Sequence, residues 1–288
     1  MVDKYSALWV SHSSINDFLC CPRLYYLKNV YHSPETGHKI GLMTPSLALG
    51  QVIHGVLEEI SSLPKEKRFE KSLWDRFERL WQEVSGEKGG FFTAEEEKKY
   101  KTRGKKMIER IIKNPGPLKK LAVKIKEDLP YFWLSEEEGV ILCGKIDWLE
   151  YQPEKESVHI IDFKTGRSKE LANSLQLPIY TLLASACQEH SIEQASYWYL
   201  EYNDRPTLVD LPIESEIKRE VLEVAKKIKL ARRMERFQCP EGKNGCRYCQ
   251  PYEKIIAGEA QRVGLGKYGN DIFVLPPKRE KLNDSKIF

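Results

Sequence analysis

The 288-residue sequence contains no hydrophobic run that approaches the ~20 residues of a membrane-spanning helix. Its first residues, MVDKYSALWVSHSS, lack the basic and apolar segments of a secretory signal. The phosphate-loop pattern GxxxxGK[ST], internal repeats and low-complexity tracts are also absent. We therefore expect a cytoplasmic protein that is neither a membrane protein nor a nucleotide-driven motor.

Neither sign of charge is in large excess, because the formal net charge is only +4. Apolar residues make up 41% of the chain and charged residues 31%, which is typical of a folded protein. The basic residues are nevertheless unevenly distributed. Residues 98–126 hold twelve Lys or Arg and one acidic residue, and residues 218–236 hold eight basic and three acidic residues. Each stretch is compatible with a phosphate-binding surface or with a solvated helix face.

The seven cysteines, in a chain without a secretion signal, favour metal binding or buried thiols over disulfides. Cys143 and Cys187 stand alone in apolar segments and are expected to be inert core thiols. The others lie towards the two ends of the chain: Cys20, Cys21, Cys239, Cys246 and Cys249.

The C-terminal group contains the C-x2-C pattern CRYC, which suits zinc or an iron–sulfur cluster. Three cysteines leave such a site one ligand short. We expect the fourth to be Cys21, directly before Pro22, in preference to Cys20.

Helical periodicity is clearest in SLALGQVIHGVLEEI, where Gly50, His54 and Glu58 share one face. Residues 65–126 are charged and helical in pattern, and Thr93 with Glu96 forms a capping box. This stretch is interpreted as a helical insertion.

Beyond Pro130 the pattern becomes strand-like in YFWLS, GVILCGKIDWLEYQ and SVHIIDFK, which we expect to pair in sequence order. A helix over 170–190, strands in ASYWYLEYN and TLVDLPI, and a helix over 216–236 follow. After residue 251 only DIFVL looks like a strand. This alternation predicts an α/β fold.

Two carboxylates, Asp147 and Asp162, emerge from what we expect to be adjacent strands. A buried carboxylate is costly without a partner, and a divalent cation is a common partner. Asp162 and Lys164 share one strand face, while Phe163 points to the other and leaves its carbonyl available. A hard cation such as Mg²⁺ or Mn²⁺ could bind both carboxylates, that carbonyl and His54.

Lys164 beside such a metal suits phosphodiester hydrolysis, because its ammonium can stabilise charge on a phosphate or help to orient and deprotonate the attacking water. Gln176 and Tyr180 face the same way from the next helix and could hold the lysine and a DNA end. Glu58, one turn after His54, is expected to support the imidazole without binding the metal.

The segments GQVIHGVLEE, GKIDWLE, IIDFKTG and LQLPIY resemble the PD-(D/E)xK nuclease superfamily, specifically its RecB-like branch, over residues 11–255. The resemblance implies a metal-dependent nuclease with a catalytic lysine and a final motif of Gln and Tyr. Its implied metal ligands are His54, Asp147, Asp162 and the Phe163 carbonyl; the catalytic set adds Lys164, Gln176 and Tyr180.

The segment CPRLYY is similar to the first-cysteine segment of family members that carry a [4Fe-4S] cluster, a type related to CRISPR-associated and recombination exonucleases. The implied ligands are Cys21, Cys239, Cys246 and Cys249. This chain departs from the family spacing, because QPYEKII occupies the place of the usual last cysteine and Cys239 has to substitute. Zinc is the alternative metal.

The resemblance implies a restriction-endonuclease-like α/β core, with a central mixed β-sheet flanked by helices and a cysteine cluster that joins the N- and C-terminal segments. We expect a single nuclease domain over 1–288. Its parts are an N-terminal segment (1–64), a helical insertion (65–126), the catalytic core (127–236) and the cysteine region with a tail (237–288).

The expected activity is exonucleolytic hydrolysis of single-stranded DNA or DNA ends to leave 5′-phosphates, in DNA repair, recombination, CRISPR adaptation or phage or plasmid DNA processing. The alternatives are a structure-dependent endonuclease and a non-catalytic nucleic-acid-binding subunit. DNA is the expected partner, together with a possible helicase or another subunit of a nuclease complex.

Overall fold

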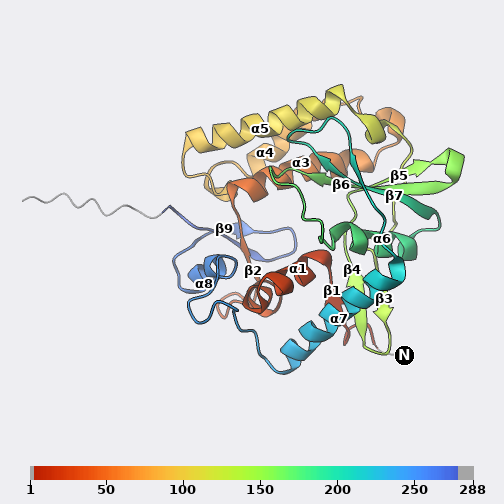
Figure 1. Cartoon of the computed structure of the whole chain (residues 1–288). Helices are drawn as coiled ribbons and strands as arrows, with labels where there is room; N and C mark the ends of the chain where they lie inside the picture. The colour runs from red at the N-terminus through yellow and green to blue at the C-terminus, as the bar shows by residue number, and fades with distance from the viewer. Residues whose placement is uncertain (1–2, 278–288) are drawn as a thin grey trace, which may run out of the picture.

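The computed structural model describes residues 3–277, so the last part of the predicted 237–288 segment lies outside the described residues. Helices and strands alternate along the chain (Figure 1). The helices are α1 (His12–Cys20), α2 (Pro22–Tyr25), α3 (Pro45–Ser61), α4 (Leu73–Glu83), α5 (Ala94–Lys113), α6 (Gln176–Cys187), α7 (Glu214–Arg233) and α8 (Gln250–Ile256). Among the described residues, none of these helices has the length and hydrophobicity needed to cross a bilayer.

The strands form three sheets. They are β1 (Leu8–Val10), β2 (Ile40–Leu42), β3 (Tyr131–Ser135), β4 (Val140–Cys143), β5 (Trp148–Gln152), β6 (Ser157–Lys164), β7 (Ser191–Tyr199), β8 (Thr207–Val209), β9 (Gln261–Leu265) and β10 (Asp271–Val274). The largest sheet has the order β5-β6-β7-β8, with β6 and β7 parallel and the other pairs antiparallel. The predicted mixed α/β class is confirmed.

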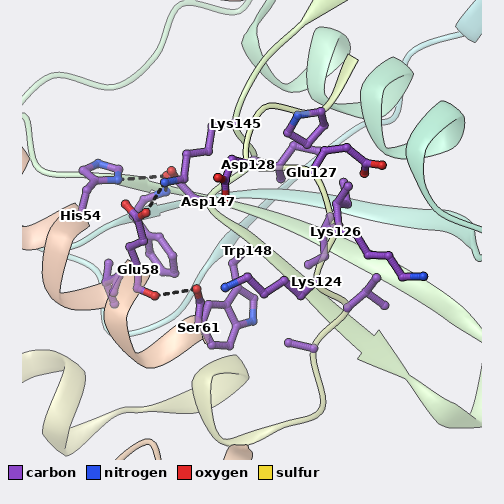
Figure 2. A pocket seen from close by; sticks show the side chains of 18 residues that line it. His54, Glu58, Ser61, Lys124, Lys126, Glu127, Asp128, Lys145, Asp147 and Trp148 are labelled. Atoms are coloured by element: carbon purple, nitrogen blue, oxygen red, sulfur yellow. Dashed lines mark hydrogen bonds and ion pairs between the residues drawn. The ribbon is translucent and has the colours of Figure 1, made fainter. Parts of the chain in front are cut away.

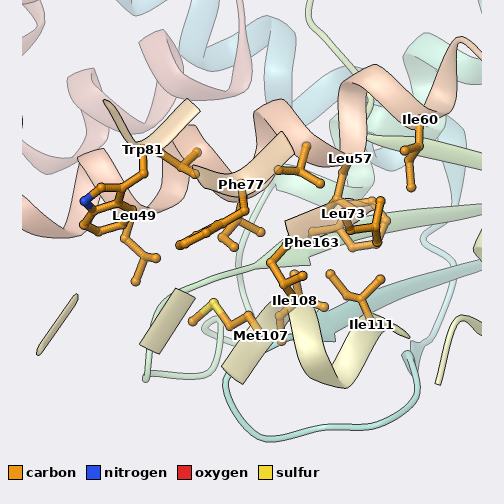
Figure 3. Close-up of a cluster of buried hydrophobic side chains, with 14 of the residues drawn as sticks. Leu49, Leu57, Ile60, Leu73, Phe77, Trp81, Met107, Ile108, Ile111 and Phe163 are labelled. Atoms are coloured by element: carbon orange, nitrogen blue, oxygen red, sulfur yellow. The ribbon is translucent and has the colours of Figure 1, made fainter. Parts of the chain in front are cut away.

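Helices α3, α4 and α5 cover one face of this largest sheet (Figure 1). Their apolar stripes meet side chains of β5, β6 and β7 in the cluster of Figure 3, where Phe77, Trp81 and Phe163 are fully or almost fully buried. Gly104 lets α5 approach closely, because a Cβ at that position would lie 2.6 Å from the Phe77 ring. Helices α4 and α5 are the core of the predicted insertion. Thr93 caps α5 by accepting a hydrogen bond from Glu96 N, but the reciprocal bond from Thr93 N to the Glu96 side chain is absent among the described residues, so only half of the predicted capping box forms.

Helix α6 covers the opposite face of the same sheet, where Val158 and Ile160 of β6 pack against Leu177 and Ala184. Its other side contributes to a second cluster with α1, α7 and the sheet β1-β4-β3. Figure 1 shows this second cluster below the largest sheet and the α3–α5 layer above it.

The segment GVILCGKIDWLEYQ is not one strand, which corrects the prediction that three strands pair in sequence order. Strand β4 pairs with β1 and β3, whereas β5 belongs to the largest sheet. Between them the chain passes Leu183 of α6 so closely that a Cβ at Gly144 would lie 2.9 Å from it. The break places Asp147 directly before β5, with its side chain beyond the end of the β5–β6 ladder.

The small sheet β2-β10-β9 brings the segment after residue 260 back to the start of α3, and the predicted DIFVL strand is confirmed as β10. Asp271 anchors this sheet with a carboxylate that is only 1% exposed. It accepts hydrogen bonds from Thr36 Oγ1 (2.5 Å) and Arg262 Nε (2.8 Å), and Arg262 Nη2 lies 2.7 Å from the same carboxylate as an ion pair. Burial opposes ionisation, but Thr36, Arg262 and His38 together lower the pKa of Asp271 below its usual value.

Replacing Asp271 by Asn is expected to lower the free energy of unfolding at pH 7 by about 2 kcal/mol, because two charge-assisted hydrogen bonds are weakened. Urea denaturation measures this difference. Since the folded pKa lies below the unfolded value of about 3.9, the difference is complete above that pH and shrinks as the pH falls through the folded pKa. The exposed Asp210→Asn is the control; an equal loss in both variants would contradict the anchoring role.

Candidate active site

Strand β6 sorts its side chains onto two faces by its period of two. Ile161 and Phe163 enter the core beneath α3–α5. Asp162 and Lys164 point to the opposite face, towards Gln176 at the start of α6. The predicted shared face of Asp162 and Lys164 is confirmed.

Pairing between β5 and β6 ends at Trp148 and Ile161, so β6 continues past the end of its neighbour. Asp147 covers this edge, and its Oδ2 accepts a hydrogen bond from Phe163 N at 3.0 Å. In a strand, the N–H and C=O of one residue point to the same side. The Phe163 carbonyl therefore faces the edge where Asp147 lies.

His54 reaches the same place from α3. Its Nδ1 lies 3.3 Å from Asp147 Oδ2, and Figure 2 shows the two side chains meeting at one end of a pocket. Burial alone would lower the pKa of His54, but the carboxylates of Asp147 and Asp162 outweigh it and raise the pKa above its usual value.

Asp162 is the most buried of these groups, at 2% exposure. Its Oδ1 accepts a hydrogen bond from Gln176 Nε2 at 2.8 Å. Its Oδ2 lies 3.0 Å from Lys164 Nζ, yet no donor among residues 3–277 is oriented to hydrogen-bond it, so we describe this contact as an ion pair only. Burial and the neighbouring Asp147 raise the pKa of Asp162 to about 7, although Lys164 and His54 oppose the increase.

Lys164 is surrounded by acceptors. Its ammonium contacts Gln176 Oε1 and lies 2.9 Å from Glu170 Oε1, in addition to its ion pair with Asp162. Burial would lower the pKa of Lys164, but Asp162 and Glu170 raise it. Gln176 Nε2 also contacts the Tyr180 hydroxyl at 3.3 Å, so the predicted i, i+4 pair does face one way.

These groups fit a hard divalent cation. The Asp147 carboxylate, the His54 imidazole and the Phe163 carbonyl lie at one sheet edge, and Asp162 is near enough to raise the pKa of His54. One buried oxygen of Asp162 has no hydrogen-bond donor among residues 3–277 and lies beside the Lys164 ammonium. Oxygen-rich donor sets of this type suit Mg²⁺ or Mn²⁺.

A family model described as the PD-(D/E)XK nuclease superfamily matches residues 9–253. The chain belongs to this superfamily. Its members are nucleases that use divalent metals, in agreement with the donor set at the end of β6. No curated protein shows significant similarity to the chain.

The prediction that Glu58 supports His54 is wrong, because the two side chains have different partners. Glu58 instead pairs with Lys145 and lies 3.8 Å from Lys267, while the partner of His54 is Asp147. Sharing a helix face brought Glu58 near His54, but lysines from two distant segments engage its carboxylate. Glu170 was not anticipated, because nothing in its loop sequence indicates that it pairs with Lys164.

About half of the basic residues of 98–126 form ion pairs within the described part of the protein, whereas only Lys226 and Lys229 do so among those of 218–236. In α5, Arg103 and Arg110 attach the helix to the loop after β7 through Glu201 and Asp204. In α7, Lys226 pairs with Glu138. Tyr25 and Trp148 are in the core, at 2% and 3% exposure, and so are not available to stack on bases.

The cysteines from the two ends converge. The sulfur atoms of Cys21, Cys239, Cys246 and Cys249 all lie within 4.8 Å of one another, and all four residues are buried. Cys21, at the N-cap of α2, takes part, as predicted in preference to Cys20. The cluster joins the N- and C-terminal segments, as the sequence predicted.

The cysteine cluster fits a metal group on chemical grounds. Burial opposes ionisation of Cys246, but the backbone amides of Cys249 and Tyr248 lower its pKa to about 7, which favours the thiolate form that binds metals. Burial raises the pKa of Cys21 and Cys249, so these two thiols are neutral without a cation. Tetrahedral zinc with Zn–S bonds of about 2.3 Å separates its sulfur ligands by about 3.8 Å. Cys246 Sγ and Cys249 Sγ are 3.7 Å apart. A four-iron cluster is larger, so its ligands would stand further apart.

Proposed function

We propose that this protein is a metal-dependent deoxyribonuclease that hydrolyses single-stranded DNA or DNA ends and leaves 5′-phosphates. The observation that carries the proposal is the meeting of His54, Asp147 and Asp162 at one sheet edge, with Lys164 paired to Asp162. Membership of the nuclease superfamily supports hydrolysis of a phosphodiester bond.

In this proposal Asp147, Asp162, His54 and the Phe163 carbonyl hold Mg²⁺ or Mn²⁺. When bound, such an ion lowers the pKa of a coordinated water and neutralises charge on the phosphate. The protein groups orient the oxygen donors. The Asp147 side chain is already fixed by Phe163 N, and Asp162 is fixed by Gln176, so two oxygen donors are oriented before any ligand arrives.

Lys164 stabilises negative charge that develops on the reacting phosphate. Its ion pairs with Asp162 and Glu170 keep it as an ammonium, which favours this role over acceptance of a proton from water. Gln176 bridges Asp162 and Lys164, and Tyr180 steadies the amide of Gln176. The Gln and Tyr thus position the catalytic lysine.

The pocket beside these residues supports a single-stranded substrate. It has a volume of about 230 Å³ and extends from His54 and Asp147 along the chain segment 122–128. A cavity of this size accommodates part of a single nucleotide strand. Lys124 and Lys145 in its wall supply positive charge for a phosphodiester backbone.

The test compares a linear and a circular single-stranded DNA of the same length, each with Mg²⁺, Mn²⁺ or EDTA. We expect the linear strand to be degraded with either metal and to give products that carry 5′-phosphates, whereas the circle resists. Denaturing gels with label at either end measure the cleavage and its polarity.

Cleavage of the circle would identify an endonuclease and contradict exonucleolytic action. Binding of the linear strand without cleavage in any metal would identify a non-catalytic subunit. A matched RNA strand tests whether the substrate is DNA.

A further inference from the structure

Glu58 lies among three lysines that come from separate parts of the chain. Lys145 belongs to the link between β4 and β5, Lys124 to the segment before β3, and Lys267 to the turn between β9 and β10. Lys145 pairs directly with the Glu58 carboxylate, and Lys267 Nζ lies 3.8 Å from the same oxygen. Lys124 and Lys145 both line the pocket that contains His54 and Asp147.

The close-up in Figure 2 shows how these lysines lie. The amines of Lys145 and Lys124 point to the side of the pocket where Glu58 projects from α3, whereas Lys126 is directed away from it. Partial burial would raise the pKa of Glu58, but Lys145, Lys267 and Lys124 together lower it below the usual value. The three lysines therefore form a local positive centre around Glu58, within a pocket that Glu127 and Asp128 also line.

Helix α3 sets the distance between this anion site and the metal-binding residues. Glu58 follows His54 by four residues, about 6 Å along the helix axis. Successive phosphates of an extended single strand lie a comparable distance apart. A strand with one phosphate at His54 and Asp147 would accordingly bring a neighbouring phosphate to the lysines.

The turn that carries Lys267 is held in place. Gly266 N donates to Asn270 O at 2.8 Å, Gly269 N donates to Gly266 O at 3.0 Å, and the flanking strand β10 is anchored through Asp271. The side chain of Lys267 is 73% exposed, so it can leave Glu58 for a ligand without the loss of a buried contact.

We propose that Lys124, Lys145 and Lys267 form a binding subsite for a backbone phosphate of single-stranded nucleic acid, next to the scissile position. In the free protein the Glu58 carboxylate occupies this subsite and competes with the phosphate. The strand's own phosphate has to displace it. The proposal rests on the proposed nuclease function and adds the residues that hold the strand beside the reacting bond.

Two double variants with equal loss of charge test the subsite. Lys145→Gln/Lys267→Gln removes two of its lysines. Lys65→Gln/Lys155→Gln is the matched control, because both of these lysines are also exposed and lie within 4 Å of a carboxylate, but their partners are Glu66 and Glu193 instead of Glu58. Fluorescence anisotropy with a labelled single-stranded oligonucleotide in EDTA measures binding without cleavage, and thermal melting confirms that each variant is folded.

The subsite variant is expected to bind the oligonucleotide roughly tenfold more weakly at low salt, and the slope of log K against log salt should fall by about 0.7 for each lost phosphate contact. The control pair should bind within about twofold of wild type, as expected for lysines away from the strand. Glu58→Gln should bind several-fold more tightly, because the competing carboxylate is gone. Inorganic phosphate should compete weakly, since it makes only one of the strand's contacts.

Equal binding by the two lysine pairs would overturn the subsite, and so would weaker binding by Glu58→Gln, which would instead indicate a supporting role for that carboxylate. These results are separable from the proposed function. Metal-dependent cleavage by wild type with equal binding by both pairs would refute the subsite alone. Lysine-dependent binding without cleavage in any metal would refute the nuclease activity and leave the subsite standing.

Discussion

Replacing Asp162 by Asn is expected to reduce metal-dependent DNA cleavage by on the order of 10³-fold or more while the protein stays folded. Asparagine keeps the size of the side chain and can still contact Gln176, but it removes the negative charge that we propose attracts the cation. Initial cleavage rates of a labelled single strand across a range of Mg²⁺ and Mn²⁺ concentrations measure the effect.

The stability of this variant provides an independent readout. In the metal-free protein Asp162 is almost fully buried beside a second carboxylate, so its ionised form is unfavourable, as its pKa of about 7 indicates. Removal of that charge should leave the unfolding temperature unchanged or raise it. If Asp162 served the stability of the fold, Asp162→Asn would instead lower the unfolding temperature. Loss of activity without loss of stability therefore marks Asp162 as a functional residue.

Asp271→Asn is the matched control, because it also replaces a buried aspartate by its amide. That variant should lose stability, and any loss of cleavage through the turn that carries Lys267 should be far smaller than the loss in Asp162→Asn. If Asp162→Asn cleaved DNA as fast as wild type, the nuclease site would lie elsewhere or the cleavage would come from a contaminant. Lys164→Ala should lower the DNA cleavage rate by about 10²- to 10³-fold, as expected for removal of one group that stabilises developing charge.

Much of this site could be predicted from local periodicity. A period of two along SVHIIDFK puts Asp162 and Lys164 on one face, and a spacing of four puts Gln176 and Tyr180 on one side of α6. Both relations depend only on neighbours in sequence and on the type of secondary structure, so they survive in the fold.

The contacts that the sequence did not predict are long-range. Gly144 and Lys145 interrupt the apolar pattern only briefly, and this local signal does not show that β4 and β5 separate into different sheets there. Glu58 shares a face with His54, but the lysines that engage it lie in two distant segments of the chain. Local pattern fixes which way a side chain points; tertiary packing determines what it meets.

The cysteine cluster could be predicted in part from the sequence. The chemistry of CRYC indicates a metal site but leaves it one ligand short, and counting the remaining cysteines narrows the choice to the two adjacent residues before Pro22. The fold distinguishes them. Cys21 is fully buried in the cluster with Cys239, Cys246 and Cys249, whereas Cys20 lies at the end of α1 with its sulfur near Asn16.

Replacing Cys21 by Ala is expected to remove the bound metal and to lower the stability of the protein by roughly 5 kcal/mol, the value for opening a cross-link that closes a loop longer than 100 residues. The reason is the position of the cross-link in the chain. The metal group would join α2 to the segment that follows α7, and most of the described chain lies between these two segments. Thermal melting and metal analysis of the purified protein measure the two effects. We expect a much lower unfolding temperature in the variant.

Cys20→Ala is the matched control, since it removes a thiol one residue away and should leave both metal content and unfolding temperature unchanged. Equal effects of the two substitutions would contradict the assignment of Cys21. The metal analysis also decides the identity of the group. Iron and sulfide with visible absorbance would establish the iron–sulfur cluster that the resemblance implies, and one zinc per chain would establish the single tetrahedral ion that the 3.7 Å separation of Cys246 and Cys249 matches. Wild-type protein that contains neither metal and melts together with Cys21→Ala would show that the four thiols only pack against one another.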